Sequence, residues 1–186
     1  IVVLLIMSIA GGYFVWERAI ATVIFEKGVS TYQQTGNIQS VKSSTIKSIG
    51  MVSSDIYWRG LTEISLLDLG GVLGSITDKN QVADSVKTQV QTLIANSVES
   101  AKKAVSIDEG NFQNWFALGR VYEVLAQNGI DGSADNARNA YAEASLRSPN
   151  NPSVSLALAR LDVFDGNIMG ARENINKSLE LKNNYT

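Results

Sequence analysis

The stretch that decides the fold is NWFALGRVYEVLAQNGIDGSADNARNAYAEASLRSPNN, residues 114–151. Large apolar side chains recur through its first half at helical spacing, and small ones recur through its second half. These residues are Trp115, Leu118, Gly119 and Tyr122, then Ala137, Tyr141, Ala144 and Pro149. Residues three or four apart lie on one face of an α-helix. Small side chains let a second helix approach closely, and proline ends a helix because it has no N–H to donate. The stretch therefore predicts two antiparallel helices joined by a turn.

The order W-x2-L-G-x2-Y followed by A-x3-Y-x2-A-x4-P resembles the tetratricopeptide repeat (TPR). The resemblance implies an all-α fold, a TPR-like solenoid of stacked helical hairpins. One departure is the turn at 128–133, which is about six residues longer than the usual turn of the family. In this longer turn we expect Ser133 or Asp135 to cap the next helix.

A second copy follows in register at 151–184, with residues of matching size at the repeat positions. Those positions are Leu158, Ala159, Gly166, Ala171, Ile175, Ser178 and Leu181, while Ser155, Asp162 and Asn183 replace the Trp, Tyr and Pro. Weaker copies at 25–55 and 53–111 bring the prediction to about four helix pairs. The last two pairs are expected at 112–127/134–148 and 152–165/168–182, and a long turn at 70–81.

Composition excludes several function classes. The net charge is −2, and the chain has neither histidine nor cysteine. A nucleic-acid surface is therefore not expected. The commonest general base, the commonest metal ligand and thiol chemistry are all missing. The acidic loop at 131–136 lacks the Gly and Glu that a calcium loop needs at its sixth and twelfth positions. We expect no catalytic residues, no metal, no cofactor and no enzyme activity within this chain.

The first sixteen residues carry no charge, and Tyr13, Phe14 and Trp16 precede the charged pair Glu17 and Arg18. This pattern is typical of a membrane helix ending at the interface. A spanning helix needs about 20 apolar residues, so residues 1–16 are predicted to be the C-terminal part of a transmembrane helix. The start at Ile1 without Met and the end just after a helical stretch indicate a fragment. A signal peptide and a buried core helix remain alternatives.

In a TPR-like solenoid the first helices of successive repeats line a concave surface. Eight residues there are not needed for packing and are predicted to bind a partner protein: Gln113, Phe116, Arg120, Glu123, Ser153, Leu156, Arg160 and Val163. Arg120 and Arg160 are expected one above the other, where guanidinium groups suit a carboxylate; the alternative is that both are simply solvated. Phe116 and Leu156 replace parts of the carboxylate clamp of some family members, so that ligand class is not expected.

The chain is thus divided into a transmembrane segment (1–16), a helical spacer or degenerate repeats (17–94) and TPR repeats (95–186). The leading interpretation is a membrane-anchored scaffold for protein–protein interaction, with a protein or peptide in its groove. The alternative is the non-catalytic tail of a multi-pass bacterial membrane enzyme, because the architecture is similar to that of O-antigen ligase-type proteins. The predicted localisation is the membrane, and the ligase-type resemblance favours the extracytoplasmic side for the repeats.

Overall fold

The structure is a computed structural model that describes residues 2–76 and 82–183, with side chains described from residue 12 to residue 182 within those ranges. All regular structure in these ranges is α-helical, in eight helices. The helices are α1 (Val2–Thr35), α2 (Ile38–Met51), α3 (Asp55–Ser75), α4 (Asp84–Ile107), α5 (Phe112–Gln127), α6 (Ser133–Arg147), α7 (Pro152–Phe164) and α8 (Ile168–Asn183).

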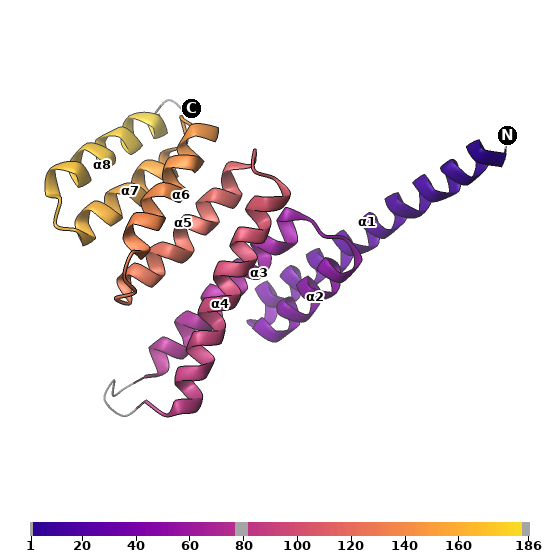
Figure 1. Ribbon diagram of the computed structural model, residues 1–186, viewed down its shortest axis with the longest axis horizontal. Coiled ribbons are helices and arrows are strands. Elements are labelled where there is room, and N and C mark those ends of the chain that lie inside the picture. Colours follow the sequence, from indigo (N-terminus) through magenta and orange to yellow (C-terminus); the bar gives the residue numbers. More distant parts are fainter. Residues whose placement is uncertain (1, 77–81, 184–186) are drawn as a thin grey trace.

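Consecutive helices form four hairpins, α1/α2, α3/α4, α5/α6 and α7/α8, which stack side by side along the chain (Figure 1). Each hairpin also contacts the next one, through α2 and α3, α4 and α5, and α6 and α7. The prediction of an all-α stack of helical hairpins is therefore confirmed for the described residues. The helix bounds of the last two pairs differ from the predicted ones by at most one residue at each end.

Short side chains and glycines fix the ends of these helices. Asn37, Asn111 and Asn151 each precede a helix and accept a hydrogen bond from the backbone N–H of its second residue. This satisfies one of the donors that a helix N-terminus leaves free. The turns after α1 and α7 contain Gly36 and Gly166, whose φ angles of 68° and 73° are left-handed. The two Gly-Asn-Ile turns that the sequence repeats thus have the same structural role.

The packing of α5 against α6 depends on one close approach. A Cβ on Gly119 would lie 2.5 Å from the ring of Tyr141, so no larger residue fits there without a shift. Tyr141, Ala137 and Ala144 are all fully buried. They form one core cluster with Val154, Ala157 and Leu161 of α7, whereas Leu118, Val121 and Leu125 of α5 pack on Leu66, Ala101 and Val105 in a second cluster.

Two local expectations are wrong. The turn predicted at 70–81 begins later, because α3 continues through Gly70, Gly71 and Gly74 to Ser75; the rest of that turn, 77–81, lies outside the described residues. Packing explains the extension: Leu69 is 1% exposed and α3 packs on α4, and this burial outweighs the low helix propensity of glycine. The residue before α6 is Gly132, with φ at 72° and no side-chain cap, in place of the expected Ser133 or Asp135.

The predicted transmembrane helix at 1–16 is also wrong. Within the described part of the chain, none of the helices has the length and apolar character needed to cross a bilayer. The apolar run stops at Trp16, and α1 continues unbroken through Glu17 and Arg18 to Thr35. Its second half packs on α2, where Ala21 is fully buried and its carbonyl accepts a hydrogen bond from Ser48. The prediction of a membrane localisation rested on that helix and is wrong as well.

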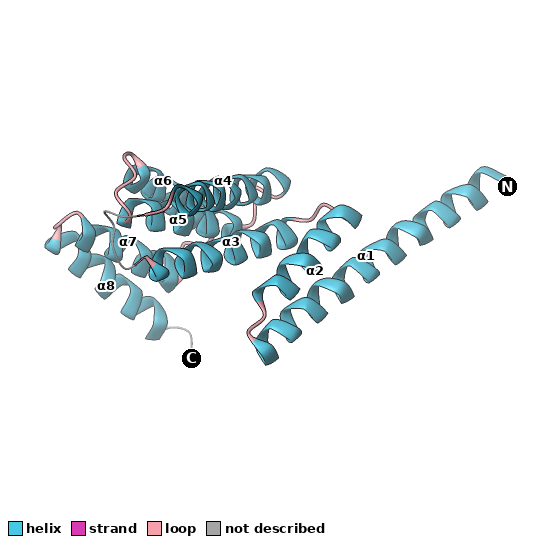
Figure 2. Cartoon of the chain, turned by 90° about the horizontal axis from the view of Figure 1, so that it is seen from below, coloured by secondary structure: helices cyan, strands magenta, loops and turns pink. Residues whose placement is uncertain are grey.

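Figure 2 shows the first half of α1 extending beyond the stacked hairpins. Tyr13, Phe14, Val15 and Trp16 on this segment are each at least 59% exposed. Residue 94, the predicted end of the spacer, lies inside α4. The division of the chain at that position stays a prediction.

Candidate protein-binding face

The first helices of the last three hairpins form one side of the molecule. Successive first helices contact each other, α3 with α5 and α5 with α7, in addition to their contacts within and between hairpins. We call the solvent-facing side of α3, α5 and α7 the inner face. It is the surface on which the sequence places the partner-binding residues.

The structure places the eight predicted residues in three environments. Six are exposed, Phe116 is half-buried against Tyr141 with ring centroids 5.3 Å apart, and Glu123 is 5% exposed. The exposed six are Gln113, Arg120, Ser153, Leu156, Arg160 and Val163. Glu123 is therefore used within the fold, while the others present atoms to solvent.

Arg120 and Arg160 each bind a carboxylate on the preceding first helix. Arg120 donates to both carboxylate oxygens of Glu63 on α3, at 2.8 and 2.7 Å. Arg160 donates through Nε and Nη2 to the two oxygens of Glu123 on α5, at 2.6 and 2.9 Å. Side-chain exposures of 44% and 45% leave both guanidinium groups open on one side. The inner face thus carries two ion pairs that join consecutive hairpins.

Glu123 also accepts a hydrogen bond from the buried Tyr141 hydroxyl at 2.5 Å. Burial and this hydrogen bond raise the pKa of Tyr141 well above its ordinary value. The hydrogen bond to Glu123 likewise raises the pKa of Arg160. Arg160 is therefore needed to neutralise a carboxylate that α7 has removed from water.

An apolar groove opens beside Arg160, with a volume of about 400 Å³. It is lined by Gln127, Leu156, Ala159, Arg160, Val163, Phe164 and Ile175. Leu156, Val163 and Phe164 on α7 are 46%, 57% and 51% exposed. Apolar residues gathered in this way, with a polar rim, are typical of an interaction surface.

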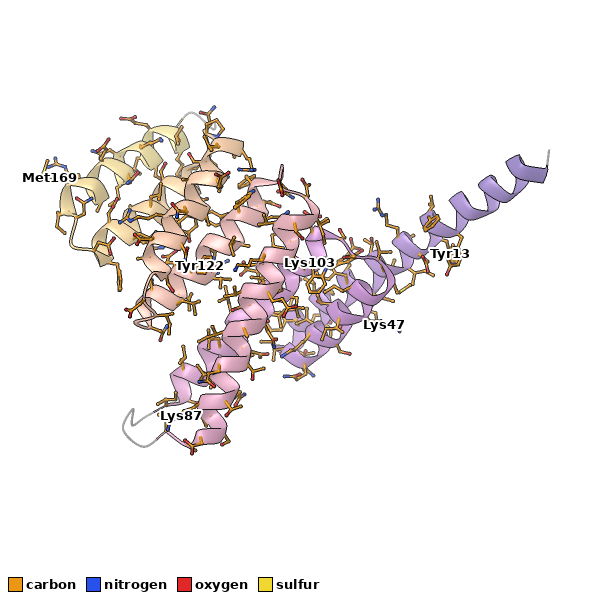
Figure 3. All side chains as sticks on the ribbon, in the orientation of Figure 1. Tyr13, Lys47, Lys87, Lys103, Tyr122 and Met169 are labelled. Carbon is orange, nitrogen blue, oxygen red and sulfur yellow. The ribbon has the colours of Figure 1, made fainter. Side chains whose placement is uncertain are left out.

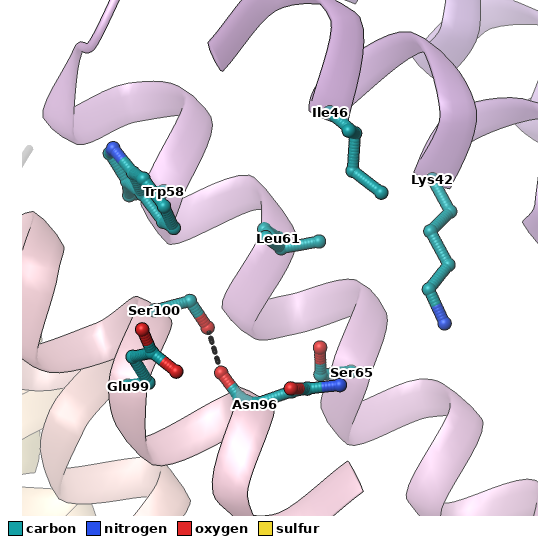
Figure 4. Close-up of a pocket in the computed structure, with 8 residues that line it drawn as sticks. All are labelled: Lys42, Ile46, Trp58, Leu61, Ser65, Asn96, Glu99 and Ser100. Atoms are coloured by element: carbon teal, nitrogen blue, oxygen red, sulfur yellow. Dashed lines mark hydrogen bonds between the residues drawn. The ribbon is translucent and has the colours of Figure 1, made fainter. Parts of the chain in front are cut away.

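A smaller hollow of about 230 Å³ lies between α2, α3 and α4 (Figure 4). Two of its polar side chains have partners: Lys42 binds Asp68 at 2.8 Å, and Ser100 donates to the Asn96 carbonyl at 2.6 Å. Across the described side chains, no buried polar atom is left without a hydrogen bond. The hollow therefore offers no buried unsatisfied group that would point to a ligand.

Sequence reasoning missed two buried polar centres between the hairpins. Asn114 is fully buried; it donates to Asp55 at 3.1 Å and to the carbonyls of Ala104 and Asp108, and it accepts from Arg59. Burial works to raise the pKa of Asp55, but the hydrogen bonds from Asn114 and Asn111 hold it below its ordinary value. This centre joins α3 and α5.

The second centre is Asp162 on α7, which is 3% exposed where the repeat pattern has Tyr. It binds Arg138 of α6 at 2.9 Å and Asn174 of α8 at 2.8 Å. Arg138 also binds Asp165 at 2.7 Å. The sequence signal for this second centre was Asp162 itself, a polar residue at the position where the repeat pattern has Tyr.

Comparison by sequence finds no family model and no curated protein that matches the chain. Comparison of structures finds similar folds. The crystal structure of MamA is 14% identical with a TM-score of 0.62, over 88% of this chain and 79% of that one. The crystal structure of a thermophilic TPR protein from Thermus thermophilus is 15% identical with a TM-score of 0.45, over 87% of this chain and 91% of that one. At these identities the likeness concerns the fold alone. Together with the four hairpins, the similarity to the MamA structure shows that the described part of this chain is an all-α stack of helical hairpins.

Proposed function

We propose that the chain is a scaffold that binds a protein partner on its inner face. The observation that carries this proposal is the apolar groove on α7, beside a guanidinium group that is open to solvent on one side. Arg120, in the other ion pair of the inner face, is likewise open to solvent on one side. No catalytic role is part of the proposal.

The chemistry of the inner face indicates the kind of segment that it would bind. Leu156 and Val163 lie seven residues apart on α7 and present apolar surface along one side of the helix. Arg120 and Arg160 add donors for a carboxylate or for backbone carbonyls. A partner segment with apolar side chains and acidic or carbonyl groups therefore fits this face.

The alternative, a non-catalytic tail of an O-antigen ligase-type enzyme, receives no support from the structural relatives described above. It depended on a membrane helix that the described residues do not contain. The proposed scaffold function does not depend on a membrane helix.

The test is site-specific photocrosslinking in the cells that express the protein. A benzophenone amino acid replaces Gln113 or Ser153, which are exposed on the inner face and take part in no side-chain ion pair. Matched controls carry it at Lys102 on α4 and Leu146 on α6, which are exposed on second helices. We expect the same discrete crosslinked protein from both inner positions and from neither control. Equal crosslinking from all four positions would overturn the proposal.

Charge reversal of the arginines is a poorer test. Arg160→Glu would place a second carboxylate beside the buried Glu123, and the loss of a buried pair partner destabilises a fold. Lost binding in that variant would not distinguish a binding site from unfolding. Crosslinking positions avoid this ambiguity because they remove no packing contact.

A further inference from the structure

The last hairpin ends the described stack with an apolar surface. We call this surface the terminal face; its members are Leu156 and Val163 of α7 and Arg172, Ile175 and Leu179 of α8. Ile175 and Leu179 are 41% and 54% exposed. Met169, at the start of α8, also projects away from the stack (Figure 3) and is 86% exposed.

The previous hairpin shows what such a face accepts. On α5 and α6, the positions equivalent to Leu156, Val163 and Ile175 are Phe116, Glu123 and Tyr141. Helix α7 covers all three: Tyr141 and Glu123 are 0% and 5% exposed, and Phe116 is half-buried in the same cluster as Val154, Ala157 and Leu161. The terminal face therefore repeats the surface on which the structure already seats one helix.

The third and fourth hairpins also carry an arginine at equivalent positions of their second helices. Arg138 follows the buried Ala137 on α6 and binds Asp162 and Asp165 of α7 at 2.9 and 2.7 Å. Arg172 follows the buried Ala171 on α8 in the same way, and it is exposed. Arg172 forms no ion pair with any residue that the structure describes. A helix seated like α7 would bring a carboxylate to this guanidinium group.

One position differs, and it restricts the occupant. Glu123 receives Arg160 from α7, whereas the equivalent residue on the terminal face is Val163. An arginine facing Val163 would lose water without gaining a partner, which is costly for a charge. The occupant must therefore be apolar at the position where α7 carries Arg160.

From these observations we infer that the terminal face is the docking site for an amphipathic helix of a partner protein. This helix lies parallel to α7, presents an apolar ridge to Leu156, Val163 and Ile175, and carries carboxylates in its last two turns that bind Arg172. The inference rests on the proposed scaffold function and names the chemistry of its partner. It assigns binding to the last described hairpin, on a face that shares Leu156 and Val163 with the inner face.

The probe for the test is derived from α7, the one helix seen on an equivalent surface. It is a fluorescein-labelled, hydrocarbon-stapled peptide of residues 151–166 with Arg160→Leu, because a short unstapled helix is marginal in water. Fluorescence anisotropy measures its binding to the full chain. We expect saturable binding that is abolished by Leu156→Asp with Ile175→Asp, and weakened by at least about tenfold by Arg172→Glu.

Two matched controls define the face. Lys177→Glu makes the same charge reversal on another side of α8, and Leu146→Asp makes the same apolar-to-acid change on α6, where Leu146 is 76% exposed. Neither control is expected to change the affinity. A peptide with Asp162→Lys and Asp165→Lys should bind the Arg172→Glu variant more tightly than it binds the unchanged chain. Circular dichroism of each variant shows whether it is folded.

A second measurement does not depend on a free peptide. Residues 148–183, with Arg160→Leu, are repeated directly after Leu181, so that the added hairpin continues the stack. We expect a higher unfolding midpoint than that of the original chain, and Arg172→Glu should remove part of the gain.

Three results would overturn the inference: a probe affinity that Leu156→Asp with Ile175→Asp leaves unchanged, neither probe binding nor stabilisation by the added hairpin, or self-association of the chain that Leu156→Asp abolishes. The last would assign the face to a second copy. Crosslinking from Gln113 and Ser153 tests the inner face independently, so it can succeed where this inference fails.

Discussion

The ring of Tyr141 lies against Gly119 so closely that a Cβ on the glycine would be 2.5 Å from ring atoms Cδ1 and Cε1. The two residues belong to α6 and α5, and their contact sets the distance between the helices of the third hairpin. The same tyrosine packs beside Phe116 and donates its hydroxyl hydrogen to Glu123. One residue pair therefore connects hairpin packing to the inner face.

Gly119→Leu is expected to destabilise the protein by about 1–3 kcal/mol or more, because the added side chain overpacks the contact with Tyr141. Urea unfolding followed by circular dichroism measures the change. The control is Gly71→Ala in α3, where a Cβ meets no atom within 4 Å; it should leave stability unchanged or raise it by about 0.5–1 kcal/mol. A neutral Gly119→Leu would show that the contact does not limit the packing of α5 on α6.

Tyr141→Ala should cost about 3–5 kcal/mol, the range for emptying a fully buried aromatic site. Trp115→Ala should cost less, because Trp115 is only half-buried, with its indole N–H bound to the Glu109 carbonyl and Arg147 stacked 4.7 Å from its ring. Thermal unfolding of both variants in parallel gives the order. A larger loss of stability in Trp115→Ala than in Tyr141→Ala would show that Trp115 contributes more to the packing of this repeat.

The free energy of unfolding should decrease as the pH is lowered, because folding favours the ionised form of Asp55. Its pKa is lower in the folded chain than its ordinary value of about 3.9, so folding favours the carboxylate. This contribution is fully present above the ordinary pKa and is lost as the pH falls through the lowered one. Asp55→Asn should therefore flatten the dependence of the free energy of unfolding on pH below about 4.

Arg138→Ala should destabilise the protein by about 1–3 kcal/mol, because it leaves the buried carboxylate of Asp162 without its cation. The equivalent residue of the next hairpin supplies the control. Arg172→Ala should change stability by no more than about 0.5 kcal/mol, since Arg172 is exposed. Urea unfolding compares the two. Equal losses would contradict the assignment of Arg172 to an open docking face.

The sequence alone predicted the hairpins of the last two repeats, because their determinants are local. The turn Gly166-Asn167-Ile168 and the residues Gly119, Ala137 and Ala144 belong to hairpins whose two helices are adjacent in the sequence. Periodicity of side-chain size therefore located α5 to α8 with little error. The same reasoning was less accurate for α3. The glycines near its C-terminal end were interpreted as a turn, but tertiary packing keeps them helical.

The membrane helix shows where a local pattern misleads. Sixteen uncharged residues were interpreted by their composition, but the same helix continues through Glu17 and Arg18 and packs Ala21 against α2. Which part of a long helix is buried by protein depends on how far the helices that pack on it extend along it, here α2 along α1. Composition does not contain that information.

The sequence by itself determined that the chain forms helical hairpins and which residues lie on their first helices. Only the tertiary structure decided which of those residues remain exposed to solvent and which are used in packing. Glu123 and Arg160 both occupy concave positions in the pattern, yet α7 buries the first and leaves the second half-open. Asn114 and Asp162 became buried polar centres because their partners come from other hairpins. Periodicity is set within one helix, whereas ion pairs and burial depend on how separate hairpins stack.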